Sequence, residues 1–511
     1  MKNIRYILNY IFKFYPYCIL SLVVFIVFVD FAYLNFNSPD ACIYLSTAEN
    51  IAHHQGFLVS YNLSQSFKTL YYPIWPYYQY LYSIFCSFFI DHGGSIQVIK
   101  INILLFALNV SFVFYIVQQL IPTRLNILFI CSLTLSLDFF ISALYPWTEQ
   151  LHFFCFIITF ILFLKYFKNP KHLIWLGFLN GVFMLVRYAH FFNVLGYLPF
   201  IFFDKAPFRE KFNRTIAFVG GFVLFYGLYQ MFCWHTYHAF YPQYARSIEN
   251  YNLADEFGGI VYNLDKVGIQ ISSGPILSLE HFIYIRNHIS DAFKQMPLFL
   301  FPALFYYLLP INKRKDGGVI PLCLWQSIFT LLGYSFSFYW TNQFFEPIRY
   351  SMIPFVLIGL SGWYCLYQGL SFLGPKGGKF VGLIVLLLLF CLNLGKFIES
   401  RKVLDHPRWE IPQFRNLYVN LWYINKNLPK EILVASDATW ECYFMHRPYI
   451  SIPPGKSYNC QNLMLYNKIY SPDYYLLSTN ISNDCFNEGG LKYSMIFSNG
   501  TFRILKIKKD I

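Results

Sequence analysis

The sequence predicts a polytopic α-helical membrane protein, with about eleven transmembrane helices and a small C-terminal soluble α/β domain. Of its 511 residues, 56% are hydrophobic and only 13% are charged, a balance that is typical of membrane proteins. Apolar stretches long enough to cross a hydrocarbon core of ~30 Å recur along most of the chain. After about residue 399 these stretches give way to short β-type runs, which predict a folded domain outside the membrane.

Eleven stretches are predicted to cross the membrane, and one further apolar run is ambiguous. The eleven are 15–37, 96–120, 125–145, 150–167, 173–188, 190–203, 214–234, 296–312, 318–340, 348–372 and 379–397. The ambiguous run, 73–90, contains two prolines and a row of tyrosines, which are typical of a segment at the membrane interface. We therefore predict that 73–90 does not cross.

The distribution of basic residues supports this topology. With a cytoplasmic N-terminus, the inner loops hold sixteen basic residues, whereas the short outer loops hold only Lys68, Arg187 and Arg349. The inner set is Lys2, Arg5, Lys13, Arg124, Lys165, Lys168, Lys171, Lys205, Arg209, Lys211, Arg214, Lys313, Arg314, Lys315, Lys376 and Lys379. Basic residues collect on the cytoplasmic side of membrane proteins. The net charge of +13 is thus interpreted as a topology signal and not as a nucleic-acid surface.

The predicted organisation is a transmembrane domain over 1–398 and an extracytoplasmic soluble domain over 399–511. The first includes two outer regions, 38–95 and 235–295. In the tail, EILVAS, PYISI, YYLLS and YSMIFSNGTFRILKI predict short strands, the last with a hairpin turn at Asn499-Gly500. All inner loops are short, and no phosphate-binding Walker loop or GxGxxG after a strand occurs, so a nucleotide-binding domain is not expected.

The stretch SPDACIYLSTAENIAHHQGF predicts an amphipathic helix at the membrane surface, directly after the first span. Ser38 and Pro39 suit a helix start, and Gly56 suits its end. Asp40 falls in the first turn, where the helix dipole favours the ionised carboxylate. Two interpretations stay open: Asp40 is a base that accepts a proton in catalysis, or it only complements the dipole.

Ionisable residues from six stretches are predicted to share one depth, toward the outer ends of their spans. They are Asp30, Asp40, Asp138, Glu149, His152, Arg187, His190, Glu346 and Arg349. Such residues are costly in a membrane and are functional candidates, although interfacial side chains that seek water would give the same pattern. Glu149 and His152 are spaced to share a helical face. The pairs His53-His54 and His235/His238 lack a carboxylate or cysteine partner, so no metal or other cofactor is expected.

Five pieces of the chain, in order, resemble the GT-C superfamily of membrane glycosyltransferases. They are SPDACIYLSTAENIAHHQGF, YYPIWPYYQYLYS, LYPWTEQLHFF, GFLNGVFMLVRYAHF and RYSMIPFVLIGLSG ahead of a soluble tail. The likeness is to the branch of protein O-mannosyltransferases and the lipid A aminoarabinose transferase. It implies transfer of a sugar from a polyprenyl-phosphate donor to a lipid, glycan or protein acceptor, at the extracytoplasmic face of a membrane, with the bacterial cell membrane preferred over the endoplasmic reticulum.

The resemblance also implies roles for particular residues. Asp40 would be the general base, Glu149 the second acidic residue, and Arg187 and Arg349 contacts to phosphate or substrate. Many relatives carry two adjacent acids where this chain has Asp40-Ala41, and a basic residue where it has Tyr71-Tyr72. Lys68 is the nearest cation to that position, so Lys68, Tyr72 and His152 complete the predicted substrate-binding set.

Three other function classes stay open as alternatives. A transporter or flippase of lipid-linked glycans would place ionisable residues near the midplane of repeated halves, whereas here they lie toward one face and no internal repeat is evident. A polymerase or ligase of such glycans also works on the outer face. A membrane scaffold without catalytic function leaves the convergence of acids and arginines unexplained.

The topology is tested by reporter fusions at Gly94, Lys315 and the C-terminus. We expect extracytoplasmic signals at Gly94 and the C-terminus and a cytoplasmic signal at Lys315, because only that arrangement places the sixteen basic residues inside. A cytoplasmic signal at Gly94 would mean that 73–90 crosses, and would overturn the assignment of every later loop.

Overall fold

The structure is a computed structural model that describes most of the chain. The described residues are 2–34, 39–54, 61–62, 80–90, 94–187, 189–237, 303, 306, 316–341, 352–404, 412–437, 449–451, 467, 471–479, 486–487 and 491–508. The chain divides into two compact units. The membrane unit contains residues 1–35, 96–230 and 268–401, and the sheet unit contains 36–95, 231–267 and 402–511.

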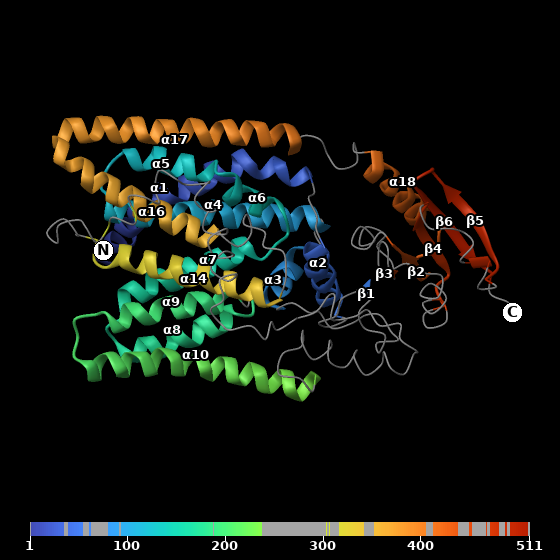
Figure 1. The fold of residues 1–511 in the computed structure, drawn as a ribbon, viewed down its shortest axis with the longest axis horizontal. Helices are drawn as coiled ribbons and strands as arrows, with labels where there is room; N and C mark the ends of the chain where they lie inside the picture. The colour runs from blue at the N-terminus through green and yellow to red at the C-terminus, as the bar shows by residue number, and fades with distance from the viewer. Residues whose placement is uncertain are drawn as a thin grey trace. The chain divides into compact units, whose positions relative to one another are not determined.

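The membrane unit is a bundle of helices that lie side by side (Figure 1). Its elements are α1 (Lys2–Phe28), η1 (Val29–Leu34), α4 (Gly94–Leu120), α5 (Leu125–Thr134), α6 (Leu137–Leu144), α7 (Glu149–Tyr166), α8 (Pro170–Phe183), α9 (His190–Phe202), α10 (Phe208–Tyr237), α14 (Val319–Thr341), α16 (Met352–Leu370), η4 (Ser371–Leu373) and α17 (Gly374–Leu404). Among the described residues, six helices are long and apolar enough to span a bilayer, and the chain is a multi-pass membrane protein. The count of eleven spans stays a prediction, since 296–312 lies almost wholly outside the described residues.

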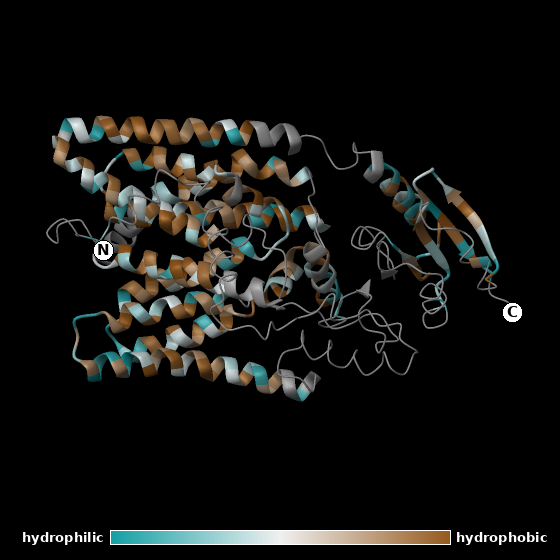
Figure 2. Cartoon of the chain, in the orientation of Figure 1, coloured by the Kyte–Doolittle hydropathy of each residue, from teal (hydrophilic) through white to brown (hydrophobic). Residues whose placement is uncertain are grey.

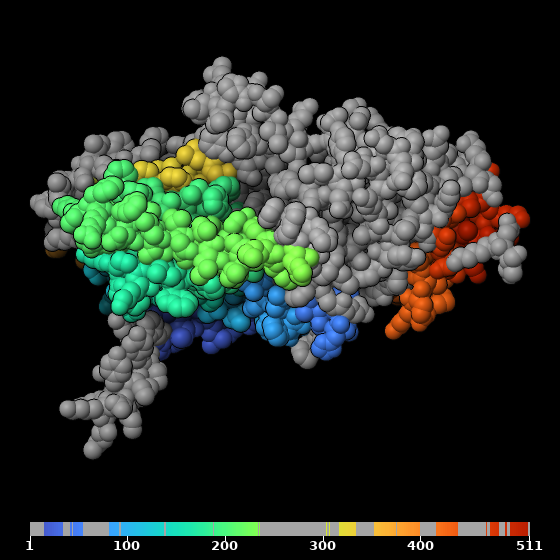
Figure 3. Space-filling view, turned by 90° about the horizontal axis from the view of Figure 1, so that it is seen from below, coloured from blue at the N-terminus to red at the C-terminus, as the bar shows by residue number. Residues whose placement is uncertain are grey.

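The outward surfaces of the bundle are apolar, as lipid contact requires. Helix α17 exposes Phe380, Leu388 and Leu392, each more than half accessible, and α10 exposes Leu224 and Met231 in the same way. Figure 2 shows both helices as largely hydrophobic, and Figure 3 shows α10 at the surface of the membrane unit. Because lipid tails are as apolar as leucine, such surfaces are stable only in a membrane.

Basic residues gather at one end of this bundle, where short connections join α7 to α8, α9 to α10, and α16 to α17 (Figure 1). At the α9–α10 connection the buried guanidinium of Arg214 pairs with Asp204, at 2.6 Å, and with Glu210. It also lies 5.8 Å from the ring centroid of Phe167, at the end of α7. We call this region the basic end. It contains nine of the sixteen predicted inner residues, namely Lys165, Lys168, Lys171, Lys205, Arg209, Lys211, Arg214, Lys376 and Lys379, which agrees with the predicted charge asymmetry.

The ionisation of Asp204 reflects this setting. Partial burial acts to raise its pKa, but the hydrogen bond from Arg214, the backbone N–H of Lys205, and the charges of Arg214 and Lys168 together lower the pKa below its usual value. Asp204 therefore stays ionised and compensates Arg214.

Helices α8 and α10 cross at two glycines. A Cβ on Gly177 would lie 1.9 Å from the carbonyl oxygen of Phe218, and a Cβ on Gly221 would lie 1.9 Å from that of Ile174. Close backbone approach at small residues is how membrane helices gain packing contacts. The crossing is therefore fixed by Gly177 and Gly221.

Two predicted spans differ from the structure. The stretch 125–145 forms two helices, because Ser136 is extended and its hydroxyl donates to the carbonyl of Leu133, which ends α5 and starts α6. The stretch 173–188 contains α8 only to Phe183, and turns follow up to Arg187. Both predictions treated an uninterrupted apolar run as one helix.

The sheet unit holds six strands in the order β1-β3-β2-β4-β6-β5. They are β1 (Tyr61–Asn62), β2 (Val434–Ser436), β3 (Tyr449–Ser451), β4 (Tyr474–Ser478), β5 (Tyr493–Ser498) and β6 (Phe502–Ile507). The first four in that order are parallel, and β6 runs antiparallel to both of its neighbours, β4 and β5. All four strand-bearing stretches predicted in the tail are confirmed, and Gly500 has the positive φ of 82° that its turn requires. Helix α18 (Pro412–Asn427) packs on β6 and was not predicted.

Residues of the predicted outer region 38–95 also belong to this unit. Strand β1 pairs with β3 at the edge of the sheet, and α2 (Pro39–Ala52) packs against α3 (Tyr80–Ile90). At the end of β2, Asp437 accepts hydrogen bonds from the amide and hydroxyl of Ser478 at the end of β4, at 3.0 and 2.6 Å. Burial of Asp437 raises its pKa despite these bonds. The predicted boundary at 398/399 falls inside α17, and the two-domain division stays a prediction.

The glycine crossing gives a test of packing. Gly221→Ala should destabilise the protein by ~1–3 kcal/mol, because the new methyl meets a backbone carbonyl that cannot rotate away. The matched control is Gly220→Ala on the same helix, where a Cβ meets nothing within 4 Å. That control should be neutral, or stabilising by up to ~1 kcal/mol through helix propensity. Thermal unfolding of the two purified variants in detergent measures the difference, and equal midpoints would contradict the proposed close crossing.

Candidate functional site

The site is built around a break between α6 and α7. Helix α6 ends at Leu144, and Tyr145-Pro146-Trp147 interrupts the chain before α7 begins at Glu149. Asn102 of α4 holds this break, since its amide donates to the carbonyls of Tyr145 and Trp147 at 2.7 and 3.4 Å. The rings of Tyr145 and Trp147 stack with centroids 4.2 Å apart. The break therefore has a defined geometry, which fixes the position of Glu149.

In the first turn of α7, a second amide contact anchors the same segment. Asn109 of α4 donates to the side-chain oxygen of Gln150 at 2.9 Å, and Gln150 donates to the hydroxyl of Ser142 on α6 at 2.7 Å. All three side chains are buried. Buried polar groups that satisfy one another restrict the core to one arrangement. Helices α4, α6 and α7 are thereby locked together beside Glu149.

Arg187 meets Glu149 from a second break, between α8 and α9. Its Nη1 lies 2.6 Å from Oε1 of Glu149 and 3.1 Å from the hydroxyl of Thr148. The side chains of Arg187 and Glu149 are only 8% and 1% exposed, so this is a buried ion pair. Removal of either partner would leave an uncompensated charge in apolar surroundings.

About one turn further along α7, His152 contacts a second histidine, His190 of α9. Nε2 of His152 lies 3.1 Å from Nδ1 of His190, and Nε2 of His190 lies 2.9 Å from Oδ1 of Asn180. Because the amide nitrogen of Asn180 donates to the carbonyl of Leu176, its Oδ1 accepts, and Nε2 of His190 must donate. In the neutral imidazole, Nδ1 of His190 is then the acceptor that faces His152.

Asn193 and Thr330 extend this cluster to a fourth helix. The amide nitrogen of Asn193 lies 3.2 Å from Nε2 of His152, and its oxygen accepts a hydrogen bond from Thr330 of α14 at 2.8 Å. We call His152, His190, Asn180, Asn193 and Thr330 the histidine network. It joins α7, α8, α9 and α14 and supports the chain on both sides of Arg187.

The structure thus brings together four of the predicted residues: Glu149, His152, Arg187 and His190. Asp30 lies on η1 with its side chain exposed, which agrees with the alternative that it is a solvated end. Lys68, Tyr72, Glu346 and Arg349, and the side chain of Asp138, lie outside the described residues. Within the described residues, no group of three or more His, Cys, Asp or Glu is arranged to hold a metal ion.

Asp40 is the second residue of α2, as predicted, and its side chain lies outside the described part of the chain. The apolar face of α2 is buried in protein, with Ala41, Leu45 and Ala48 inaccessible and Tyr44 packed edge-to-face on Tyr82 of α3. The prediction of a helix that only lies on the membrane was therefore incomplete. The predicted end at Gly56 was also wrong: α2 ends at Ala52, and His54 takes the left-handed conformation with φ 58°.

Sequence reasoning missed the amides and hydroxyls that position the charged residues. Asn102, Asn109, Asn180, Asn193 and Thr330 are nearly or fully buried in apolar helices. A polar residue inside a predicted span is itself a signal, because an unsatisfied group is costly there. The predicted site contained ionisable residues and Tyr72 only, so these amides and hydroxyls were not among its members.

Comparisons with known proteins show which fold this is. No protein-family model and no curated protein sequence matches the chain. The crystal structure of the Archaeoglobus fulgidus oligosaccharyltransferase in the apo form superposes with a TM-score of 0.55 at 12% identity, covering 91% of this chain and 70% of that one. The oligosaccharyltransferase AglB of the same organism, with an inhibitory peptide and a dolichol-phosphate, gives 0.54 at 11% identity over 98% and 75%. The chain has the GT-C fold.

This finding confirms the resemblance to GT-C proteins at the level of the fold. A further structure of the A. fulgidus enzyme, with zinc and sulfate, gives a TM-score of 0.54 at 12% identity. The predicted branch, that of O-mannosyl and aminoarabinose transferases, is not shown by these likenesses. In this fold, the ion pair of Glu149 and Arg187 and the histidine network join separate helices around two helix breaks.

The ion pair is tested by a double-mutant cycle. Glu149→Gln and Arg187→Met should each destabilise the protein by ~3–5 kcal/mol, because each leaves its partner charged and buried. The double variant should recover part of the loss, since both charges are gone. Unfolding in detergent gives the coupling energy.

A matched control is the more exposed pair of Arg214 and Glu210. Glu210 is 46% exposed, so Glu210→Gln should cost ~0–1 kcal/mol. Additive losses in the Glu149 and Arg187 cycle would show that the two side chains do not act as a pair.

Proposed function

We propose that this protein is a membrane glycosyltransferase that moves a sugar from a polyprenyl-phosphate donor to an acceptor at the outer face of the membrane. The observation that carries the proposal is the buried pair of Arg187 and Glu149 at the helix breaks of a GT-C fold. A guanidinium in a site with little water matches phosphate oxygens with its planar donors. The site therefore suits a substrate that arrives in the lipid phase and bears a phosphate.

A lipid-linked donor is supported by two facts. The A. fulgidus oligosaccharyltransferase of the same fold was solved with a dolichol-phosphate and an inhibitory peptide. In this chain the inner connections are short, and the sequence lacks a nucleotide-binding loop, so an activated sugar on a lipid fits better than a sugar nucleotide. The acceptor belongs to the class of lipids, glycans or proteins.

The length of α7 supports the proposed outer location. Its 18 residues span ~27 Å, close to the thickness of the hydrocarbon core. Lys165 lies in its last turn, at the basic end, and Glu149 in its first. If the basic end is cytoplasmic, as basic residues indicate, Glu149 and Arg187 lie toward the extracytoplasmic side.

The proposed reaction is a single displacement with inversion. Asp40, in the first turn of α2, removes the proton from the acceptor hydroxyl as its oxygen attacks the anomeric carbon. The bond from that carbon to the phosphate oxygen breaks, and the polyprenyl phosphate leaves with the electron pair. Arg187 and Arg349 stabilise the negative charge on the departing phosphate.

The remaining predicted residues take supporting roles. Glu149, the second acidic residue, acts through Arg187 by holding its guanidinium in place. His152 supports the same region through the histidine network, and Lys68 and Tyr72 stay predicted contacts to the substrate. No step requires a metal ion, because a phosphate monoester is a good leaving group once its charge is stabilised.

The general base is tested by Asp40→Asn, which preserves size but cannot accept a proton. Turnover with a defined polyprenyl-phosphate sugar should fall ~10²-fold or more, with expression and membrane insertion unchanged. Glu431→Gln, an acid-to-amide change at an exposed position of the sheet unit, should retain full activity. Wild-type transfer by the Asp40→Asn protein would remove Asp40 from the reaction and leave Glu149 as the leading base.

A further inference from the structure

A cavity lies at the basic end of the membrane unit, on the other end of α7 from Glu149. It is lined by the end of α9 and the α9–α10 connection (Phe200, Phe203, Asp204 and Lys205) and by the start of α14 (Pro321 and Trp325). Its volume is about 660 Å³, within the ~300–1,000 Å³ that is typical of ligand pockets. None of these residues takes part in the site around Arg187.

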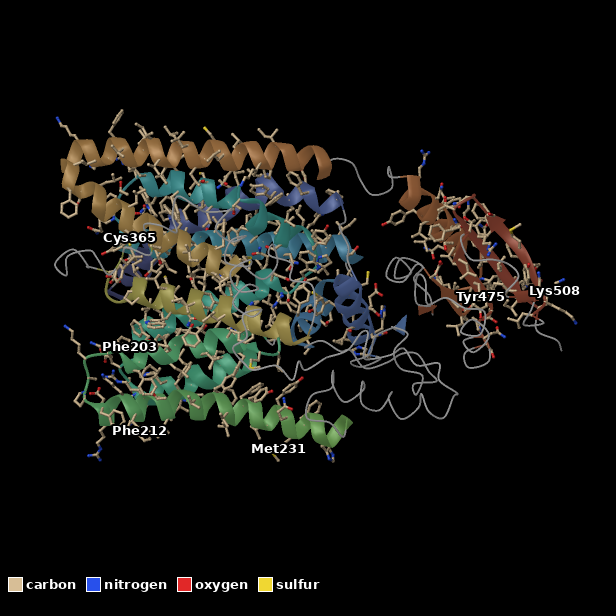
Figure 4. The ribbon with its side chains drawn as sticks, in the orientation of Figure 1. Phe203, Phe212, Met231, Cys365, Tyr475 and Lys508 are labelled. Carbon is tan, nitrogen blue, oxygen red and sulfur yellow. The ribbon has the colours of Figure 1, made fainter. Side chains whose placement is uncertain are left out.

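One wall of this cavity is aromatic and faces outward. The rings of Phe203 and Trp325 stack with centroids 5.5 Å apart and planes 11° apart. Phe203 is 73% exposed, and Figure 4 shows it at the periphery of the bundle, close to the α9–α10 connection. Phe208, at the start of α10, is exposed to the same extent. Aromatic side chains at this level are typical of the interface between hydrocarbon and lipid headgroups.

A residue larger than glycine would be strained at position 318. Gly318 also lines the cavity and has a φ of +86°, and a Cβ there would lie 2.9 Å from the ring of Phe200. The start of α14 is held in place by Asp316, whose buried carboxylate accepts hydrogen bonds from the backbone N–H of Ile320 and from the hydroxyl of Tyr306. The cavity is thus a built feature of the α9–α14 contact.

The charge around the cavity is positive. The only acidic lining residue among those described, Asp204, is compensated by Arg214, which also pairs with Glu210. Lys205 lines the cavity and makes no ion pair within the described residues, and Lys168 acts electrostatically on Asp204 from the end of α7. Arg209 and Lys211 follow on the first turn of α10. An anion is therefore attracted to this rim.

We propose that the cavity binds an anionic phospholipid of the inner leaflet. The acyl chain packs against Phe203 and Trp325, and the ammonium group of Lys205 contacts the phosphate. A membrane lipid is the chosen occupant because the cavity combines an aromatic wall at the edge of the bundle with basic residues at its rim. Anionic lipids are enriched in the cytoplasmic leaflet, to which the basic end is assigned. The bound lipid would bridge α9 and α14, the helices that Asn193 and Thr330 also join.

The experiment uses the full-length protein, purified in detergent and titrated with phosphatidylglycerol or phosphatidylcholine. Native mass spectrometry counts the bound lipids, and thermal unfolding reports stabilisation. We expect saturable binding of phosphatidylglycerol and a raised midpoint, with weaker effects of phosphatidylcholine. Lys205→Glu should weaken phosphatidylglycerol binding ~10-fold or more, because it reverses a charge next to the phosphate. Trp325→Ala should weaken the binding of both lipids.

Matched controls lie at the same end of the bundle, on α17. Lys379→Glu and Phe380→Ala change an exposed cation and an exposed aromatic residue that do not line the cavity, and both should bind phosphatidylglycerol as the wild type does. The proposal fails if Lys205→Glu retains wild-type binding, or if Lys379→Glu weakens it equally. It also fails if phosphatidylcholine binds as tightly as phosphatidylglycerol, since the cavity would then be a groove for any acyl chain.

Discussion

The buried contact between Arg187 and Glu149 is the constraint on which the rest of the membrane unit depends. Two opposite charges with almost no access to water are tolerated only when they meet at hydrogen-bonding distance, which here is 2.6 Å. Two helix breaks, one before α7 and one before α9, must therefore be positioned so that the two charged groups stay at this distance. A displacement of either break by one turn would separate the charges and leave both buried.

The neighbouring polar residues supply that accuracy. Asn102 fixes the break before α7, and the histidine network fixes α9 against α7, α8 and α14. Individual hydrogen bonds between membrane helices contribute little to stability, on average ~0.6 kcal/mol. Their larger effect is on specificity, because a shifted packing would leave several donors and acceptors without partners in an apolar environment. Leucine side chains at these positions would pack equally well in several helix–helix registers and would not select one of them.

Part of this arrangement was predictable from the sequence. The spacing of Glu149 and His152 placed both on one helix, and the composition of the tail predicted its strands, since alternation and turn residues are local signals. The partner of Glu149 was not predictable, because Arg187 is 38 positions away and no local pattern connects two helix breaks. Helix α18 was missed although Leu417, Leu421 and Ile424 form its buried face, because the apolar residues Val419 and Trp422 lie on its exposed side and obscure the helical spacing. Strand β1, with two residues, is too short to leave any signal.

Helix α7 connects the topology of the chain to its proposed chemistry. Glu149 in its first turn and Lys165 in its last turn both complement the helix dipole, and both therefore stabilise the helix. The lysines at its C-terminal end favour the cytoplasmic side during insertion. Glu149 is carried to the opposite end, ~27 Å away, where Arg187 compensates its charge. In the proposed topology, Lys165 and Lys168 therefore favour the side of the membrane on which Arg187 would meet a lipid phosphate, although they lie a bilayer's thickness from the proposed site.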